Sequence, residues 1–221
     1  MKPVSKHNPA LVIGTGRSGT SYVAAYLRKI GLHVEHESYD TLKNTSKFSG
    51  EVLVSWRWAT LGLPAGPFGV DDREVPKFGA ILHAVRHPLT TIGSWQTAQV
   101  TSFNLVNACL FGQTNKKLDP HKDKVLLAMY HWLHWNQLCE RIADYTWRVE
   151  DTTVPVIHVG IMKALNLAPE KYSLIPELGK ELNTRKRSRH YKTFEWSDLQ
   201  NHNEPLTEKI KNLALDYGYS V

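Results

Sequence analysis

The residues whose types and spacing best fit a chemical role lie in the segment 10–22, ALVIGTGRSGTSY. Four apolar residues lead into Gly14, and Gly16, Arg17 and Gly19 follow before an apolar pattern of helical spacing begins. A strand, a glycine-rich turn and a helix in that order can cradle a phosphate. The glycines let backbone N–H groups approach an oxyanion, and the helix N-terminus adds its dipole. The segment predicts an anion-binding loop; the alternative is a tight strand–helix turn that binds nothing.

The residue that supplies the positive charge of this loop distinguishes a Walker A nucleotide site from other anion sites. Gly14 and Gly19 are spaced as in the Walker A motif GxxxxGK[ST], but Thr20 stands where that motif has lysine. A kinase needs this lysine and a magnesium ligand. The charge is supplied here by Arg17 instead. The stretch GTGRSGTSY resembles the 5′-phosphosulfate loop of sulfotransferases that use 3′-phosphoadenosine 5′-phosphosulfate (PAPS). The resemblance implies PAPS as sulfuryl donor and adenosine 3′,5′-bisphosphate (PAP) as product.

The loop residues have different expected roles. Arg17 carries the only charge in the loop, so we expect it to stabilise the sulfonate or the leaving oxygen. Thr20 and Ser21 open the helix, where hydroxyls and N–H groups can bind the 5′-phosphate. Tyr22 stands where some sulfotransferases stack a Trp on adenine, but it can equally pack on the sheet. The expected cofactor-binding residues here are Gly16, Arg17, Ser18, Gly19, Thr20, Ser21 and Tyr22.

A second candidate segment, HAVRHP at residues 83–88, ends an apolar run of strand length and continues to Ser94. A cation at the carboxyl end of a strand and a hydroxyl on the next helix can face one crevice. The spacing resembles the sulfotransferase 3′-phosphate site, an Arg followed eight residues later by a Ser. The resemblance implies that Arg86 forms a forked pair with the 3′-phosphate and that Ser94 donates its hydroxyl. Alone, Arg86 would be read as a surface ion pair.

Sulfuryl transfer to a hydroxyl needs a general base. The candidates are Glu37 and, second, His36, at the end of a strand predicted over residues 32–37. This His-Glu pair resembles a bacterial sulfotransferase subgroup, and related carbohydrate sulfotransferases use a Glu here. Both side chains could instead be exposed polar ends of the strand.

A basic run, NTRKRSRH at residues 183–190, lies near the C-terminal end. It resembles a sulfotransferase loop that closes over the 3′-phosphate, with Arg185 and Lys186 as the first candidates. It could also be a nucleic-acid patch or a solvated loop. The segment 147–151, WRVED, resembles a family strand, although Val149 replaces an adenine-contacting aromatic residue found in some members.

The longest predicted helix covers residues 121–145 and has one apolar face. His131 and His134 are spaced like metal ligands on this helix, but no third ligand occurs in a matching context. We therefore expect no metal site. Trp132 and Trp135 are expected to pack in the core.

The elements that must position these residues alternate between strands and helices. A helix is predicted over residues 20–30 with Gly31 as its stop, and another begins at Pro88. Residues 79–85 predict a buried strand, residues 51–61 a helix and residues 63–77 a loop. This order predicts an α/β three-layer sandwich around a parallel sheet. The resemblance implies a P-loop NTPase-like sulfotransferase topology, with residues 1–221 as one domain.

Composition limits the function further. The chain has 221 residues, a net charge of +6, 42% hydrophobic and 22% charged residues, which is typical of a globular protein with anionic partners. Its two cysteines predict no disulfide framework. The absence of a long apolar run or leader predicts a cytoplasmic protein without membrane contact.

Two other functions are alternatives to sulfuryl transfer. One is a P-loop kinase acting on a nucleotide or small molecule. The sequence lacks both the Walker A lysine and the second carboxylate that such a kinase needs. The other is a non-catalytic nucleic-acid-binding protein, for which interleaved stacking aromatics are missing, so we expect no nucleic-acid partner. The acceptor is expected to be a hydroxyl of a small molecule or glycan; the sequence specifies neither it nor the oligomeric state.

Overall fold

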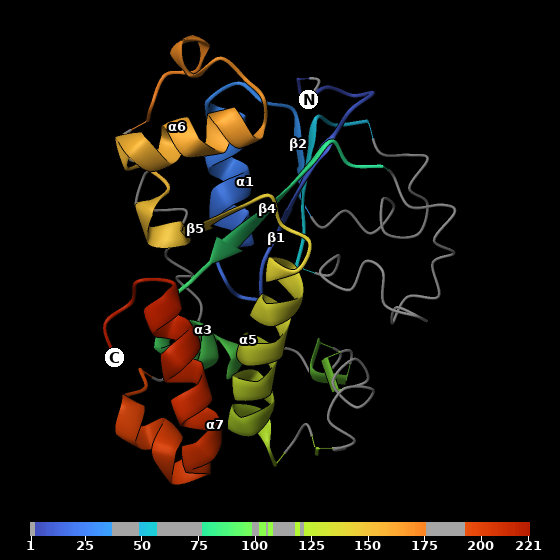
Figure 1. Cartoon of the computed structure of the whole chain (residues 1–221). Coiled ribbons are helices and arrows are strands. Elements are labelled where there is room, and N and C mark those ends of the chain that lie inside the picture. Colours follow the sequence, from blue (N-terminus) through green and yellow to red (C-terminus); the bar gives the residue numbers. More distant parts are fainter. Residues whose placement is uncertain are drawn as a thin grey trace.

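A five-stranded parallel sheet forms the centre of the computed structural model, which describes residues 3–36, 49–56, 77–98, 102–104, 106–107, 118–119, 122–175 and 193–221. Every strand pairs in parallel, in the order β2-β3-β1-β4-β5 (Figure 1). The predicted α/β fold with a parallel sheet is confirmed. The strands are β1 (Ala10–Ile13), β2 (Val34–His36), β3 (Val52–Val54), β4 (Ala80–Val85) and β5 (Tyr145–Arg148).

Helices cover both faces of this sheet because its central strands are apolar on both sides. Ala10 and Val12 of β1 belong to a core cluster with α1 and α6, whereas Leu11 and Ile13 belong to a second cluster with α3, α5 and α7. Figure 1 shows α1 beside α6, and α5 beside α7. The helices are α1 (Thr20–Lys29), α3 (Pro88–Trp95), α5 (Lys124–Glu140), α6 (Pro155–Ala164) and α7 (Trp196–Asp216), with short 3-10 turns η4 (Val149–Asp151) and η5 (Pro169–Lys171).

Local signals placed several helix ends correctly. Gly31 follows α1 with a φ of 104°, a backbone conformation that favours glycine, and Pro88 is the first residue of α3. The helix predicted over residues 121–145 is shorter, however. Asp144 already exchanges hydrogen bonds with Ile81 of β4, so the chain has entered the sheet before Tyr145. Likewise WRVED is not all strand: β5 ends at Arg148 and η4 follows.

The helix predicted over residues 51–61 is wrong in its described part. Val52, Leu53 and Val54 form β3, which lies between β2 and β1 and is fully buried. A parallel strand buried on both faces reads as a continuous apolar run, which sequence periodicity cannot separate from a buried helix. Residues 57–61, and most of the loop predicted over residues 63–77, lie outside the described residues.

The strand order brings the loop after β1 and the end of β4, which carry Arg17 and Arg86, side by side at the carboxyl ends of the strands. After β1 the chain goes to β2 at one side, returns through β3, and passes β1 to form β4 on the other side. Ligands of open α/β sheets bind outside the carboxyl ends of the strands where the order reverses in this way. In the described part of the chain, no helix combines the length and apolarity needed to cross a membrane.

Candidate anion-binding site

The loop between β1 and α1 has a backbone that glycine makes possible. A Cβ on Gly14 would lie 2.5 Å from the Ala84 carbonyl oxygen of β4 and 2.8 Å from Ser18 Oγ, so β1 and β4 approach too closely there for a side chain. Gly19, with φ 88°, is the residue before α1. Arg17 also has a positive φ, 71°, which is uncommon for a residue with a side chain. The loop is therefore held in a conformation that costs backbone energy.

Gly16 is held on both of its backbone groups by side chains from two helices. Its N–H donates to Nε2 of His131 on α5 at 2.9 Å, and its carbonyl accepts from the indole N–H of Trp95 on α3 at 2.8 Å. A Cβ on Gly16 would lie 2.6 Å from the Trp95 ring. The Gly16 N–H was expected to face a cofactor, but in this structure it points at His131.

Two buried hydroxyls of the loop have no hydrogen-bond partner within the described residues. They are Thr15 Oγ1 and Ser18 Oγ, and both residues are fully buried. Buried polar groups without a partner are rare and require an explanation. Behind them α1 begins at Thr20 without a side-chain cap, and its first N–H groups, including that of Ser21, have no partner within the helix. Orphaned donors at a helix N-terminus are what an oxyanion binds.

The two candidate arms of the site lie in direct contact. The Arg17 side chain donates from Nε and Nη2 to the Ser94 carbonyl at 3.2 and 3.1 Å, and from Nη2 to the Thr97 hydroxyl. In return, Arg86 Nη1 donates to the Arg17 carbonyl at 3.3 Å. The loop after β1, the end of β4 and helix α3 thus join at one place, where the half-buried residues Arg17, Arg86 and Ser94 are in contact.

The backbone around Arg86 is held by three different elements. The Val85 carbonyl lies 3.2 Å from the Tyr219 hydroxyl, and the Arg86 carbonyl accepts from the indole N–H of Trp132 on α5 at 3.0 Å. The His87 N–H donates to Glu150 Oε1 at 3.1 Å. These contacts restrict the backbone at Arg86. They therefore fix the position from which the Arg86 side chain extends.

Glu150 is a carboxylate near the end of β4, but its oxygens are occupied. Oε2 lies 2.8 Å from the Tyr219 hydroxyl, and Oε1 accepts the His87 N–H. The pKa of His87 is lowered by burial, which outweighs the opposite effects of Glu150 and of a backbone hydrogen bond to Ser220. His87, to which the sequence assigned no role, packs its ring 5.0 Å from that of Tyr219. This cluster anchors the end of the chain to the sheet.

Of the two candidate bases, the structure describes only His36. Its Nε2 lies 3.1 Å from Thr20 Oγ1, which links the end of β2 to the start of α1. Burial and the nearby Arg28 cation lower its pKa to about 4. Glu37, Arg185 and Lys186 lie outside the described residues.

The first turn of α1 presents two different side chains. Ser21 is exposed, whereas Tyr22 is half-buried against the core cluster of α1 and α6, and burial raises its pKa. Val149 covers Gly19: a Cβ on Gly19 would lie 3.1 Å from Val149 Cγ1. Apolar packing therefore closes this side of the loop.

His131 and His134 of α5 contact groups of the protein itself. His131 is fully buried, and its Nε2 accepts a hydrogen bond from the Gly16 N–H. Because burial lowers the pKa of His131 to about 3, the side chain is neutral at pH 7. His134 stacks on Tyr130 with a ring distance of 5.8 Å. Across the described ranges, no three His, Cys, Asp or Glu side chains gather in a way that could hold a metal ion.

Comparison of the chain with protein-family models, curated proteins and solved structures finds no match. A helix N-terminus with orphaned hydroxyls lies beside two guanidinium groups, an arrangement that can bind and neutralise an anion with more than one charged group.

Sequence reasoning missed the residues that support the site: His131, Trp132, Trp95, Thr97, Glu150 and Tyr219. One signal was present for His131, because helical spacing puts it on the buried face with Ala128 and Trp135, and a buried histidine needs a partner. No local pattern names Gly16 as that partner, since the two residues are 115 positions apart.

Proposed function

We propose that this chain is a sulfotransferase that moves a sulfuryl group from PAPS to an acceptor hydroxyl, releasing PAP. The resemblance of the loop 14–22 and of the Arg86–Ser94 pair to sulfotransferases gives the reaction class. A P-loop NTPase-like topology of the sulfotransferase type belongs to the same proposal, and the strand order with β1 at its centre, followed directly by the loop, supports it.

The observation that carries the proposal is the contact between Arg86 and the loop. Arg86 Nη1 donates to the Arg17 carbonyl, and the Arg17 guanidinium lies on the backbone of Ser94. The 3′- and 5′-phosphates of PAPS are carried by one ribose, so their binding groups must be neighbours. An Arg–Ser pair on the far side of the sheet could not serve the same nucleotide as the loop.

The donor supplies the transferable sulfuryl group and its phosphate leaving group, and the chain supplies charge and orientation. Orphaned N–H groups at the start of α1 and the hydroxyls of Thr20 and Ser21 bind the 5′ end. Arg86 and the Ser94 hydroxyl hold the 3′-phosphate. Arg17 releases the Ser94 carbonyl and donates instead to the sulfonate or leaving-group oxygens, which gain negative charge during transfer.

The general base of the proposal is Glu37, with His36 in a supporting role. A histidine with a pKa of about 4 is a weak proton acceptor at neutral pH. Its contact with Thr20 suits a residue that orients the helix start beside the bound 5′-phosphate. Arg185 and Lys186 are proposed to cover the 3′-phosphate, and the acceptor is proposed to be a small molecule or glycan with a free hydroxyl.

Ligand-induced thermal stabilisation tests this function directly. PAP should raise the melting temperature of the wild-type chain by several degrees at saturating concentration, since a ligand bound only by the folded state stabilises it by mass action. ATP with magnesium should do so much less. Arg86→Leu should remove most of the PAP effect, whereas the exposed Lys163, on α6, provides the control substitution Lys163→Leu.

Two results would contradict the proposal. Stabilisation by ATP with magnesium but not by PAP would favour the kinase. Tight DNA or RNA binding that falls steeply with salt, without any response to PAP, would favour a nucleic-acid-binding protein.

A further inference from the structure

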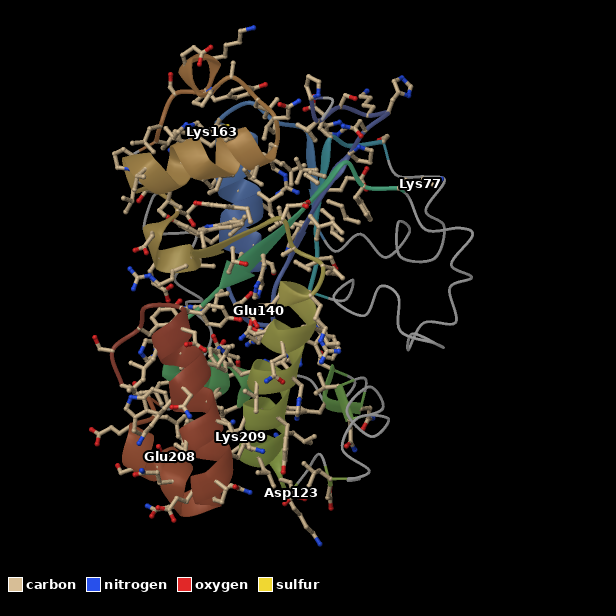
Figure 2. All side chains as sticks on the ribbon, viewed as in Figure 1. Lys77, Asp123, Glu140, Lys163, Glu208 and Lys209 are labelled. Carbon is tan, nitrogen blue, oxygen red and sulfur yellow. The ribbon has the colours of Figure 1, made fainter. Side chains whose placement is uncertain are left out.

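Two adjacent residues of α5 reach the two arms of the site separately. His131 accepts the Gly16 N–H of the loop at 2.9 Å, and Trp132 donates to the Arg86 carbonyl at 3.0 Å. Both are fully buried, and α5 is a continuous helix of 17 residues; Figure 2 labels Asp123, which precedes its first residue, and Glu140, its last. A single rigid element therefore contacts both anion-binding arms.

We propose that the His131–Trp132 pair positions the loop and Arg86 relative to each other, and so sets the affinity of the site for a two-phosphate ligand. The inference rests on the proposed assignment of the loop to the 5′ end and of Arg86 to the 3′ end. Both residues are positioning residues, because each acts through a backbone group of the arm that it holds.

The loop cannot hold this position by itself. Arg17 and Gly19 have positive φ, and two loop hydroxyls are buried without a partner, so the loop conformation has internal costs. Hydrogen bonds from helices outside the loop offset these costs at Gly16. His131 accepts the Gly16 N–H, and the Trp95 indole donates to the Gly16 carbonyl. His131 meets its acceptor role only as the neutral tautomer with Nε2 unprotonated.

The Arg86 arm depends on the same helix in a different way. Its guanidinium is the group that meets the ligand, and the Trp132 indole fixes the carbonyl of the same residue. Removing the indole N–H frees that carbonyl and lets the arm shift while the loop stays in place. The two residues should thus affect different ends of a nucleotide.

Paired substitutions separate hydrogen bonding from packing. His131→Gln keeps an acceptor near the position of Nε2, and His131→Met has a similar shape without one. Trp132→Phe removes the indole donor. His134→Met and Trp147→Phe are controls: the His134 ring stacks on Tyr130, and the Trp147 indole of β5 donates to the Thr152 hydroxyl at 3.0 Å.

Titration calorimetry with PAP, AMP and inorganic pyrophosphate measures the effect on each arm. His131→Met should weaken all three ligands by about tenfold, the value of one lost hydrogen bond, with His131→Gln restoring most of the affinity. Trp132→Phe should weaken PAP by a similar factor and leave AMP, which lacks the 3′-phosphate, within about twofold. The control variants should bind all three like the wild type.

Amide hydrogen exchange of the ligand-free protein tests the loop contact without any nucleotide. The Gly16 amide should lose protection in His131→Met and keep it in His131→Gln, while the amides of β1 stay protected in both. Equal Gly16 protection in the two variants, or equal PAP affinity, would overturn the inference.

Failure of the proposed function gives a different pattern. A wild type that binds pyrophosphate but not PAP contradicts the sulfotransferase, while pyrophosphate affinities of the two His131 variants still decide the role of His131. A wild type that binds neither overturns both.

Discussion

At the scale of single residues, the site depends on what each charged or polar group already contacts. The Arg17 guanidinium donates to the Ser94 carbonyl, and the Arg86 guanidinium donates to the Arg17 carbonyl. Their contacts differ from the surface ion pair that Arg86 alone would suggest. Two neighbouring guanidinium groups contribute a local positive potential that attracts an anion.

The assignment of the base makes a prediction about Glu37 and His36. Glu37→Gln should reduce turnover by about 10²–10⁴-fold and leave PAP affinity nearly unchanged, because the amide cannot accept the proton. His36→Asn should mainly weaken PAP binding, since it removes the contact with Thr20. Steady-state kinetics and calorimetry on both variants check this.

The same pair of variants can reverse the assignment. If Glu37→Gln turns over normally while His36→Asn is inactive and still binds PAP, His36 is the base. A pH–rate profile would then show a limb near pH 4, the value to which the pKa of His36 is lowered.

At the scale of elements, the site is built where four segments meet: the loop after β1, the end of β4, helix α3 and helix α5. The approach of β1 to β4 at Gly14 leaves no room for a side chain. Closely packed backbone of this kind transmits changes, because neighbouring strands cannot deform independently.

Substitution of Gly14 tests the importance of this approach. Gly14→Ala should destabilise the protein by about 1–3 kcal/mol, because its Cβ would meet the Ala84 carbonyl at 2.5 Å and the strands must move apart. It should also weaken anion binding, since the loop moves with β1. Urea unfolding followed by PAP titration measures both effects.

Gly31→Ala is the matched comparison. At Gly31 a Cβ meets nothing within 4 Å, but φ is 104°, so only backbone strain is introduced, at about 1–2 kcal/mol. It should lower stability and leave PAP affinity unchanged. If both variants bind PAP like the wild type, the contact at Gly14 has no bearing on the site.

At the scale of the whole molecule, buried neutral histidines tie stability to pH. His83 in β4 and His131 in α5 are fully buried, and burial lowers their pKa values to about 4 and about 3 from 6.5. His83 is held by Asn136 Oδ1 at 3.0 Å. Protons bind these side chains more readily in the unfolded chain, so acid favours unfolding.

The expected pH dependence follows from that sign. The contribution of each histidine is fully present above pH 6.5 and falls by about 1.4 kcal/mol per pH unit as the pH drops from there towards 4. Urea unfolding between pH 7.5 and pH 4.5 measures the slope. His83→Gln should make it shallower, whereas Lys163→Gln, at an exposed position of α6, should leave it unchanged. Equal slopes for the wild type and His83→Gln would refute this role of burial.

The order of strands and helices could be largely predicted from the sequence, because it depends on local chemistry. Gly31 ends α1 and Pro88 starts α3 through their own backbone preferences. The apolar run of β4 is long enough to be recognised as a strand. The segment around Val52–Val54 could not be assigned in this way, since a short run buried on both faces has no periodicity that identifies it.

The sequence by itself determined which residues could meet an anion: a glycine loop with one arginine, and an arginine and a serine eight positions apart. Only the tertiary structure decided that Arg86 contacts the loop and that His131 and Trp132 support both arms. These contacts join residues 46 to 115 positions apart. The sequence around one residue of such a contact does not indicate its partner, because the packing of the helices on the sheet determines which residues meet.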